Sequence, residues 1–357
     1  MNTIFSFVLV LGALIFVHEL GHFLFAKLFK VRVLKFSLGF GPRVCGKTFG
    51  ETEYVLSAFP LGGFVKMYGE NPDEQNASAA DKAASYCYKP AWQRFCIVFA
   101  GPLFNFIFPI ILFTAVFFFQ GVPVSLDTTQ IGEVSESSPA QEAGLQKGDI
   151  ILTIAGRAIE GWEDVLSGVK KSDGKAIEMI VLRDNAEKSV MVTPRIDSAK
   201  NLFGEEVEKR YMVGIMRGEA LEYESVNIFS AFWNGLQQTW FYIYLVFMGF
   251  VKLFQQVVPA SEMGGPILIA QMAGEQMRAG WVNLIYFTSL LSVNLGILNL
   301  LPVPVLDGGH LVFLGIESIR KKPLGERFQI ISQQVGMALL GGLMIFVFYN
   351  DIMRLLN

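Results

Sequence analysis

Residues 4–26 have the sequence IFSFVLVLGALIFVHELGHFLFA, an apolar stretch that contains the motif His18-Glu19-Leu20-Gly21-His22. At about 1.5 Å per residue, a helix of this length crosses the roughly 30 Å hydrocarbon core of a bilayer. Ionisable side chains inside such a helix are costly, so they indicate a functional site. The stretch lacks the basic leader and the Ala-x-Ala site of a signal peptide, and we expect it to remain in the mature protein.

The two histidines of this motif are four positions apart, so both imidazoles lie on one face of the helix. They can bind one Zn²⁺, and Glu19 between them can deprotonate a bound water. A catalytic zinc site needs a third protein ligand. The candidates are Asp307, which follows Pro302 and Pro304, and His310. We favour Asp307, because the prolines interrupt the helix and turn its carboxylate inward; His310 stays as the alternative.

The composition also places the chain in a membrane. It has 357 residues, of which 52% are hydrophobic and 17% charged, whereas soluble domains carry roughly a quarter charged residues. Three further apolar stretches are long enough to span a bilayer: residues 95–119, 283–318 and 333–349. In residues 227–253 polar side chains recur every three or four positions, so we expect an amphipathic helix in the membrane interface.

The distribution of charge predicts the topology. Residues 27–94 are rich in Lys and Arg, and a second basic cluster lies at residues 320–327. The positive-inside rule places both regions in the cytoplasm, which requires an even number of crossings between them. We therefore expect four spans, with both termini and residues 121–281 outside. With a net charge of -3, the chain has no electrostatic footprint for nucleic acid.

Several motifs resemble the site-2 intramembrane zinc metalloproteases. The likeness rests on the His-Glu-x-x-His of the first span and on Asn299-x-x-Pro-x-Pro-x-Leu-Asp307-Gly in the third. The loop sequence Pro60-Leu-Gly-Gly-Phe-Val-Lys-Met67 and the motif Gly101-Pro102-x-x-Asn105 in the second span also fit.

This resemblance implies roles for particular residues. Glu19 would be the general base, Asn299 would help to hold the substrate backbone, and His18, His22 and Asp307 would bind zinc. The implied substrates are single-span membrane proteins, such as an anti-sigma factor already trimmed outside, and remnant signal peptides. No small-molecule cofactor besides zinc is expected. The implied location is the inner membrane of a bacterial cell, with both termini on the periplasmic side.

Residues 53–70 contain two short β-prone runs around the turn Pro60-Leu-Gly-Gly. They resemble the family's re-entrant β-hairpin, which would offer a strand edge to an unwound substrate helix. An ordinary cytoplasmic hairpin is the alternative. The expected substrate-binding residues are Gly62, Gly63, Phe64 and Val65.

Residues 121–200 resemble a PDZ domain, through the signature that runs from Ser138 to Gly156. This signature marks a fold and not a ligand, so the domain would either screen substrates or serve as a rigid spacer. Residues 201–281 are expected to form a linker followed by the interfacial helix.

The sequence thus predicts a polytopic α-helical membrane protein with four transmembrane helices, a re-entrant β-hairpin and one inserted extracytoplasmic PDZ domain, which is mainly β. Residues 1–120 would hold the first two helices and the cytoplasmic loop, and residues 282–357 the last two. The expected activity is hydrolysis of peptide bonds within transmembrane segments. Two other classes remain open: a catalytically silent membrane adaptor, in which Glu19 is dispensable, and a metal transporter.

Overall fold

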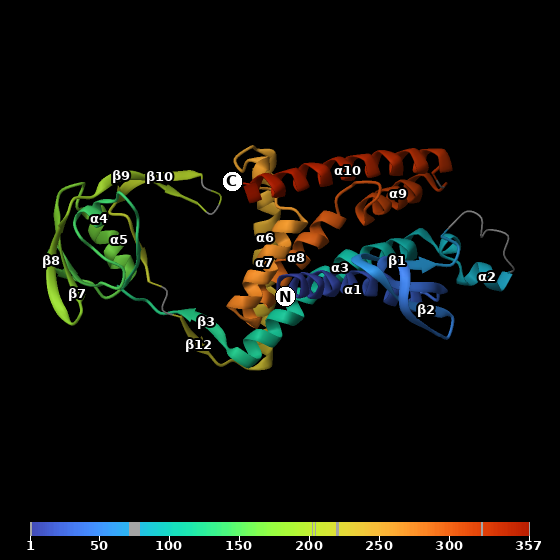
Figure 1. Cartoon of the computed structure of the whole chain (residues 1–357), viewed down its shortest axis with the longest axis horizontal. Helices are drawn as coiled ribbons and strands as arrows, with labels where there is room; N and C mark the ends of the chain where they lie inside the picture. Colours follow the sequence, from blue (N-terminus) through green and yellow to red (C-terminus); the bar gives the residue numbers. More distant parts are fainter. Residues whose placement is uncertain are drawn as a thin grey trace. The chain divides into compact units, whose positions relative to one another are not determined.

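The chain folds into two compact units (Figure 1). The computed structural model describes residues 2–70, 79–201, 203, 205–218, 221–322 and 324–356. The first unit, which we call the helical unit, comprises Met1–Phe119 and Asn227–Asn357. The second, the β unit, comprises Gln120–Val226.

The helical unit is built mainly from long apolar helices. Its helices are α1 (Asn2–Leu28), α2 (Ala79–Ala84), α3 (Ala91–Gln120), α6 (Ile228–Phe254), α7 (Pro266–Ala279), α8 (Trp281–Asn299), α9 (Asp307–Arg320) and α10 (Glu326–Leu356), with short 3₁₀ turns at Tyr86–Tyr88 and Ala260–Glu262. Within the described residues, 4 helices are long and apolar enough to cross a membrane: α1, α3, α8 and α10. The number of expected spans agrees with this finding.

The third apolar stretch, residues 283–318, is not one continuous helix. It forms α8, which ends at Asn299, and α9, which begins at Asp307. Pro302 and Pro304 lie in the intervening segment. Because proline lacks an amide hydrogen and restricts the residue before it, the helix cannot continue through this segment. The break places a carboxylate at the start of a new helix.

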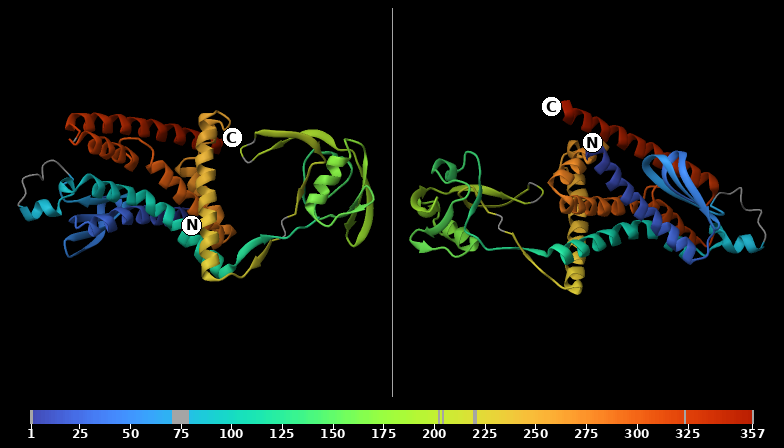
Figure 2. Two further views of the ribbon diagram at one scale, coloured as in Figure 1. Left: turned by 180° about the vertical axis from the view of Figure 1, so that it is seen from behind. Right: turned by 60° about the horizontal axis from the view of Figure 1, so that its bottom comes forward.

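The four candidate membrane spans, α1, α3, α8 and α10, alternate in direction (Figures 1 and 2). The chain runs away from the α6 end of the helical unit in α1 and α8 and back towards it in α3 and α10, so both termini lie at that end. Helix α6 crosses α3 and α8 and does not run alongside them. It approaches α3 closely at Gly235, where a Cβ would lie 3.0 Å from the backbone nitrogen of Thr114.

Helix α7 was not expected from the sequence, and it packs along the first half of α1. Val10 and Leu14 of α1 are buried in one cluster with Ala273 of α7. Close contact is possible because Gly274 has no side chain; a Cβ there would lie 3.0 Å from Thr3 Cα. The N-terminus of α7 is tied to α10, since Asp351 accepts hydrogen bonds from backbone N–H groups at residues 265, 267 and 268.

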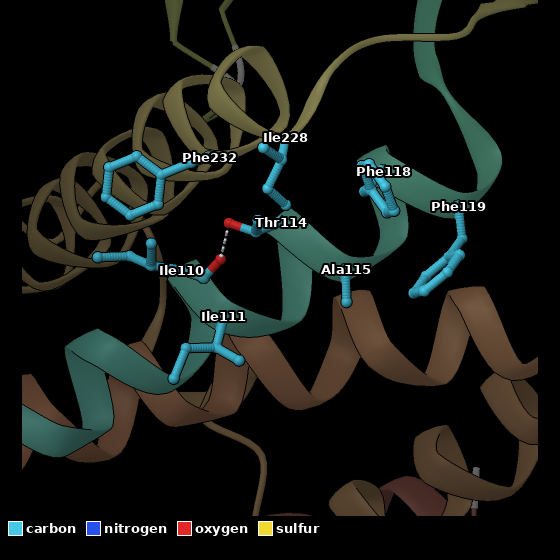
Figure 3. Close-up of a pocket in the computed structure, with 8 residues that line it drawn as sticks. All are labelled: Ile110, Ile111, Thr114, Ala115, Phe118, Phe119, Ile228 and Phe232. Carbon is cyan, nitrogen blue, oxygen red and sulfur yellow. Dashed lines mark hydrogen bonds between the residues drawn. The ribbon is translucent and has the colours of Figure 1, made fainter.

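An apolar pocket of about 440 Å³ lies between α3 and α6 (Figure 3). Its one side-chain hydroxyl, on Thr114, donates a hydrogen bond to the carbonyl of Ile110 at 2.6 Å, so the hydroxyl is already satisfied. The pocket therefore offers an apolar surface and no reactive group. Its lining residues are Ile110, Ile111, Thr114, Ala115, Phe118, Phe119, Ile228 and Phe232.

Strands β1 (Val33–Phe49) and β2 (Thr52–Met67) form a small curved sheet beside α1. The first part of β1 has partners on both sides: Phe36 lies opposite both Tyr54 and Val65. Residues 53–56 and 63–67 therefore flank β1. Within the described ranges, β1 is the one strand that pairs with residues 63–65 of β2.

This pairing differs from the hairpin expected within residues 53–70. The two β-prone runs belong to a single strand, β2, and both pair with β1 instead of with each other. Gly39, Gly41 and Pro42 lie inside β1, and such residues are rare in strand interiors, which is why the sequence did not reveal it. Register shifts around these residues let the strand bend.

Buried residues such as Ile151, Val165 and Met179 form the hydrophobic core of the β unit. Within the described residues, this unit has twelve short elements. They are β3 (Val122–Ser125), β4 (Ile131–Val134), α4 (Pro139–Glu142), β5 (Ile150–Ile154), β6 (Arg157–Ala158), α5 (Trp162–Lys171), β7 (Ile177–Arg183), β8 (Ala186–Val192), β9 (Arg195–Lys200), β10 (Glu206–Met212), β11 (Ile215–Arg217) and β12 (Leu221–Glu224). Strands β6, β5, β7 and β8 form a 4-stranded sheet.

Residues 201–226 are not the linker expected from the sequence. They contribute β10, β11 and β12, and the last two pair with β4 and β3 near the start of the unit. Each of these two strands is only three or four residues long, so an alternating pattern could not reveal it. Each is stabilised by a partner strand that lies roughly 80 to 100 residues earlier in the chain. The entry and exit strands of the β unit thus lie side by side.

The β unit contains an ion pair in which the carboxylate of Asp149 is buried and the guanidinium of Arg183 is partly exposed. The carboxylate of Asp149 accepts a hydrogen bond from Arg183 Nε at 2.6 Å and another from the backbone N–H of Gln146 at 2.8 Å. Burial alone would raise the pKa of Asp149, but these hydrogen bonds outweigh burial and hold its pKa below the usual value.

Candidate metal centre

His18, His22 and Asp307 converge between α1 and the start of α9. One ligand atom from each residue lies within 4.8 Å of the others. The carboxylate oxygen Oδ2 of Asp307 is 3.2 Å from His18 Nε2 and 3.5 Å from His22 Nε2. The two Nε2 atoms are 3.3 Å apart. The group therefore includes Asp307, and within the described residues it does not include the alternative ligand His310.

Two glycines let α1 and α3 approach each other at this point. A Cβ on Gly21 of α1 would collide with the carbonyl oxygen of Ala100 in α3. A Cβ on Gly101 would collide with the imidazole of His22 and lie 2.9 Å from His18 Cε1. Both imidazoles therefore lie close to the backbone of α3 at Gly101.

Helix α3 also fixes the orientation of His22. The Nδ1–H of His22 donates a hydrogen bond to the backbone carbonyl of Ile97 at 2.8 Å. Since a carbonyl only accepts, Nδ1 carries the hydrogen, and Nε2 is the nitrogen that faces Asp307. Hydrogen bonding of this kind orients histidines that bind metals.

Asp307 is held by the break between α8 and α9. Backbone hydrogen bonds from Val303 N to Leu301 O and from Leu306 N to Val303 O fold the segment, at 2.7 and 2.8 Å. Gly308 follows directly, and a Cβ there would collide with the carbonyl oxygens of the preceding turn. The start of α9 can therefore lie against residues 300–304, which fixes the direction of the Asp307 side chain.

The donor atoms fit a zinc ion. Asp307 Oδ2 is buried and has no hydrogen-bond partner, although it lies beside two imidazole nitrogens. Two imidazoles and one carboxylate form a common ligand set for catalytic zinc, which keeps a fourth position open. A cation bound by the three side chains would satisfy the orphaned oxygen.

Strand β2 passes next to the glutamate of the motif. A Cβ on Gly63 would lie 3.0 Å from Glu19 Cγ and 2.9 Å from Ile15 Cγ2, so the backbone of β2 touches this face of α1. Gly62 lies against the ring of Phe40. Residues 62–63 are thus brought to the site.

Phe64 and Val65, the other two residues of this strand that were expected to bind substrate, direct their side chains into contacts within the sheet and its core. Phe64 stacks on Phe40 with ring centroids 6.3 Å apart, and the side chain of Val65 is buried in a core cluster with Phe36 and Met67.

Asn299 is the last residue of α8 and is partly buried. It directly precedes the break that leads to Asp307. Within the described residues, no hydrogen bond joins its side chain to His18, His22 or Asp307.

One polar residue at the site was given no role by the sequence. Asn105 of α3 is fully buried, and its Nδ2 lies 3.0 Å from Nδ1 of His18. An amide at the centre of an apolar span is the signal that could have found it, since polar residues at membrane depth are usually functional.

Two histidines and a glutamate on one apolar helix, with a carboxylate from a second, define a metalloprotease-type site inside a bundle of membrane helices. The chain belongs to peptidase family M50, whose profile matches residues 6–343. With its four apolar helices, it is a multi-pass membrane protein and a metalloprotease of the site-2 type. Its motifs also resemble those of the bacterial regulator of sigma-E protease in a form with a single PDZ domain.

Relatives match along the whole chain. A protein from Agrobacterium fabrum is 36% identical over 372 residues, which cover 99% of this chain and 96% of the relative. The regulator of sigma-W protease RasP of Bacillus subtilis is 29% identical over 427 residues, covering 99% and 98%. The zinc metalloprotease RasP of Oceanobacillus iheyensis is 28% identical over 430 residues, covering 99% and 100%.

A solved PDZ domain of an SdrC-like protein from Listeria monocytogenes matches 26% of this chain and 90% of its own, with 19% identity and a TM-score of 0.20. A similarity this low carries no weight for the β unit.

Proposed function

We propose that this protein hydrolyses peptide bonds within or beside the transmembrane segments of single-span membrane proteins, and that His18, His22 and Asp307 hold the zinc ion it needs. The observation that carries the proposal is the convergence of these three side chains between apolar helices, with an orphaned carboxylate oxygen between two imidazoles. When bound, zinc supplies a Lewis acid and lowers the pKa of water towards neutrality.

Side chains and backbone groups of the protein carry out proton transfer and orient the ligands. Glu19 takes the proton of the attacking water and returns it to the leaving amine, a role that suits a carboxylate held beside the ligands on the same helix. The carbonyl of Ile97 keeps His22 in the orientation that aims Nε2 at the site. Surrounding apolar helices limit the access of bulk water, which strengthens every electrostatic interaction in the site.

The free edge of β2 is the proposed binding surface for the substrate. A transmembrane helix hides its peptide groups in its own hydrogen bonds, so it must unwind before cleavage, and a strand edge replaces the lost bonds. Residues 62–65 supply this edge through their backbone, as Val65 turns its side chain into the core. The contact of Gly63 with Glu19 supports this placement. Asn299, at the end of α8, is proposed to help hold the same backbone.

We also propose a topology and a location. Both termini lie at the α6 end of the helical unit, and the basic residues 27–94 and 320–327 lie in segments that begin where α1 and α9 end, which the positive-inside rule places in the cytoplasm. The protein would then lie in a bacterial inner membrane, with the termini, α6 and the β unit on the periplasmic side. Helix α6 would lie in the interface, because it crosses α3 and α8.

The substrate class follows from this arrangement. Two membrane substrates suit it: an anti-sigma factor trimmed outside, and remnant signal peptides. A relative named as a regulator of sigma-W protease supports the first. The β unit is proposed to be a PDZ domain that screens what reaches the site.

Cleavage of a purified single-span substrate in liposomes tests the proposal. The intact protein should cut within the span, Glu19→Gln should not, and Glu275→Gln, a change at an exposed glutamate of α7, should cut normally. Zinc content is measured in all three proteins, and the expected result is one zinc ion in each.

The other two classes give different results. Equal phenotypes for the intact protein and Glu19→Gln in cells, with no cleavage in vitro, would favour a silent adaptor. Zinc flux into sealed vesicles without cleavage would favour a transporter.

A further inference from the structure

Asn105 lies at the metal centre with half of its hydrogen-bonding capacity unused. Its side-chain nitrogen Nδ2 is 3.0 Å from Nδ1 of His18, and its oxygen Oδ1 is buried without a hydrogen-bond partner. The residue itself is 0% exposed. A buried amide oxygen without a hydrogen-bond partner destabilises the fold, so we expect Oδ1 to have a partner in the metal-bound protein.

The chemistry of imidazole indicates which hydrogen bond Oδ1 of Asn105 can accept. If Nε2 of a neutral histidine donates its lone pair to a metal ion, Nδ1 must carry the hydrogen and needs an acceptor. The two ends of a carboxamide have nearly the same shape, so a half-turn about the Cβ–Cγ bond exchanges Nδ2 and Oδ1 within the same space. That turn puts Oδ1 of Asn105 within hydrogen-bond reach of His18 Nδ1.

We propose that Asn105 is the positioning residue for His18: its Oδ1 accepts the hydrogen of Nδ1 and thereby directs Nε2 towards Asp307 and the metal. This inference rests on the proposed metal site. His18 would then have a hydrogen-bond acceptor for its Nδ1–H, as His22 already has in the carbonyl of Ile97. Both histidines of α1 are then oriented from the same helix, α3.

Asn105 is itself held in place from a third helix. Ser292 of α8 donates a hydrogen bond from Oγ to the backbone carbonyl of Asn105 at 2.8 Å. Gly296, one turn later, leaves room for this contact, since a Cβ there would lie 3.3 Å from Asn105 Cβ. The same helix ends at Asn299, just before the break that positions Asp307. Helix α8 therefore supports both His18, through Asn105, and the carboxylate ligand.

The test measures zinc affinity of the full-length protein in detergent by competition with a chelator. Asn105→Leu keeps the size of the side chain and removes the acceptor, so affinity should fall 10- to 100-fold, the usual range for such supporting contacts. Asn105→Asp keeps an acceptor facing His18, so its zinc affinity should stay within a few-fold of that of the intact protein. Thr114→Val is the matched control on α3, because the Thr114 hydroxyl bonds only to its own helix.

A second measurement does not depend on any variant. The chain has 3 histidines, so ¹⁵N-labelled imidazoles can be assigned, and long-range NMR correlations then show which nitrogen carries the hydrogen. In the zinc-loaded intact protein, His18 should be protonated at Nδ1.

Three results would contradict the proposed role of Asn105. A His18 imidazole without hydrogen at Nδ1 in the zinc-loaded protein overturns the inference, even if Asn105→Leu fails to fold. Equal zinc affinity of Asn105→Leu and the intact protein also overturns it and leaves the metal site standing. An intact protein that binds no zinc overturns the inference and the proposed function together.

Discussion

Gly101 of α3 lies directly against His22 of α1, so that a single methyl group on Gly101 would occupy the space of the imidazole nitrogen Nε2. The proposed ligand atom is thus packed against a helix backbone. Two neighbouring features of α3, the carbonyl of Ile97 and the amide of Asn105, contact the same pair of histidines. The metal centre therefore depends on the distance between α1 and α3.

Gly101→Ala should disrupt the site without unfolding the helix. The new Cβ would force the imidazole of His22 away from Asp307, and we expect zinc affinity to fall roughly tenfold or more, with loss of cleavage. Chelator competition and the liposome cleavage assay measure the two effects. Gly12→Ala in α1 is the control, because a Cβ there meets nothing within 4 Å. Normal zinc affinity in Gly101→Ala would show that the ligands can tolerate a wider helix spacing.

Glu19→Gln should separate chemistry from binding. The variant keeps all three proposed ligands, so zinc content should stay unchanged, while the rate of cleavage should fall by about 10²–10⁴-fold because no base removes the proton. Single-turnover cleavage rates and metal analysis on the same sample check both statements. A variant that cuts as fast as the intact protein would remove Glu19 from the mechanism.

Gly63→Val should weaken the proposed substrate edge. Its side chain would meet Ile15 and Glu19 of α1 and push β2 off this helix, so cleavage should slow while zinc affinity stays within a few-fold of the original. Gly50→Asn, in the turn between β1 and β2, is the matched control, since Gly50 has a positive φ of 61° that asparagine tolerates and no neighbour within 4 Å. Equal slowing in both variants would indicate a general loss of sheet stability.

The ion pair of Asp149 and Arg183 should make the β unit sensitive to acid. A carboxyl whose pKa is lower in the folded state stabilises the fold above its unfolded pKa of about 3.9, and this stabilisation is lost as the pH falls through the folded pKa. Urea unfolding of the full chain, followed by hydrogen exchange within residues 120–226, should therefore show constant stability above about pH 5 and a decline below it.

Arg183→Leu should cost the β unit about 3 kcal/mol near neutral pH and remove most of this acid dependence, because Asp149 would keep a buried charge without its partner. Arg195→Leu breaks an exposed ion pair with Glu142 and is the control, with an expected loss below about 1 kcal/mol. Similar losses in both variants would contradict the structural importance of the buried pair.

Much of the helical unit could be predicted from the sequence because a bilayer imposes simple rules. Span length follows from membrane thickness, and the spacing of His18 and His22 follows from helix geometry. Pro302 and Pro304 marked the break before Asp307, although the sequence did not show that the third stretch forms two separate helices.

Other features depend on contacts between residues that are distant in the sequence, which a local pattern cannot predict. Strand β1 holds glycines and a proline in its interior, and β11 and β12 acquire their structure from partners at the opposite end of the β unit. The hairpin predicted within residues 53–70 was wrong for the same reason, since both of its runs belong to β2 and pair with β1. The position of Asn105 against His18 required the crossing of α1 and α3, which only the folded chain shows.

The placement of the ligands has a consequence for biosynthesis. His18 and His22 leave the ribosome well before Asp307, which lies 285 residues after His22, on a helix that begins after the break. A nascent chain would therefore lack the proposed ligand set until α9 has been inserted next to α1. The proposed site would in this way stay inactive during insertion, when the protein's own unassembled spans are the nearest membrane helices.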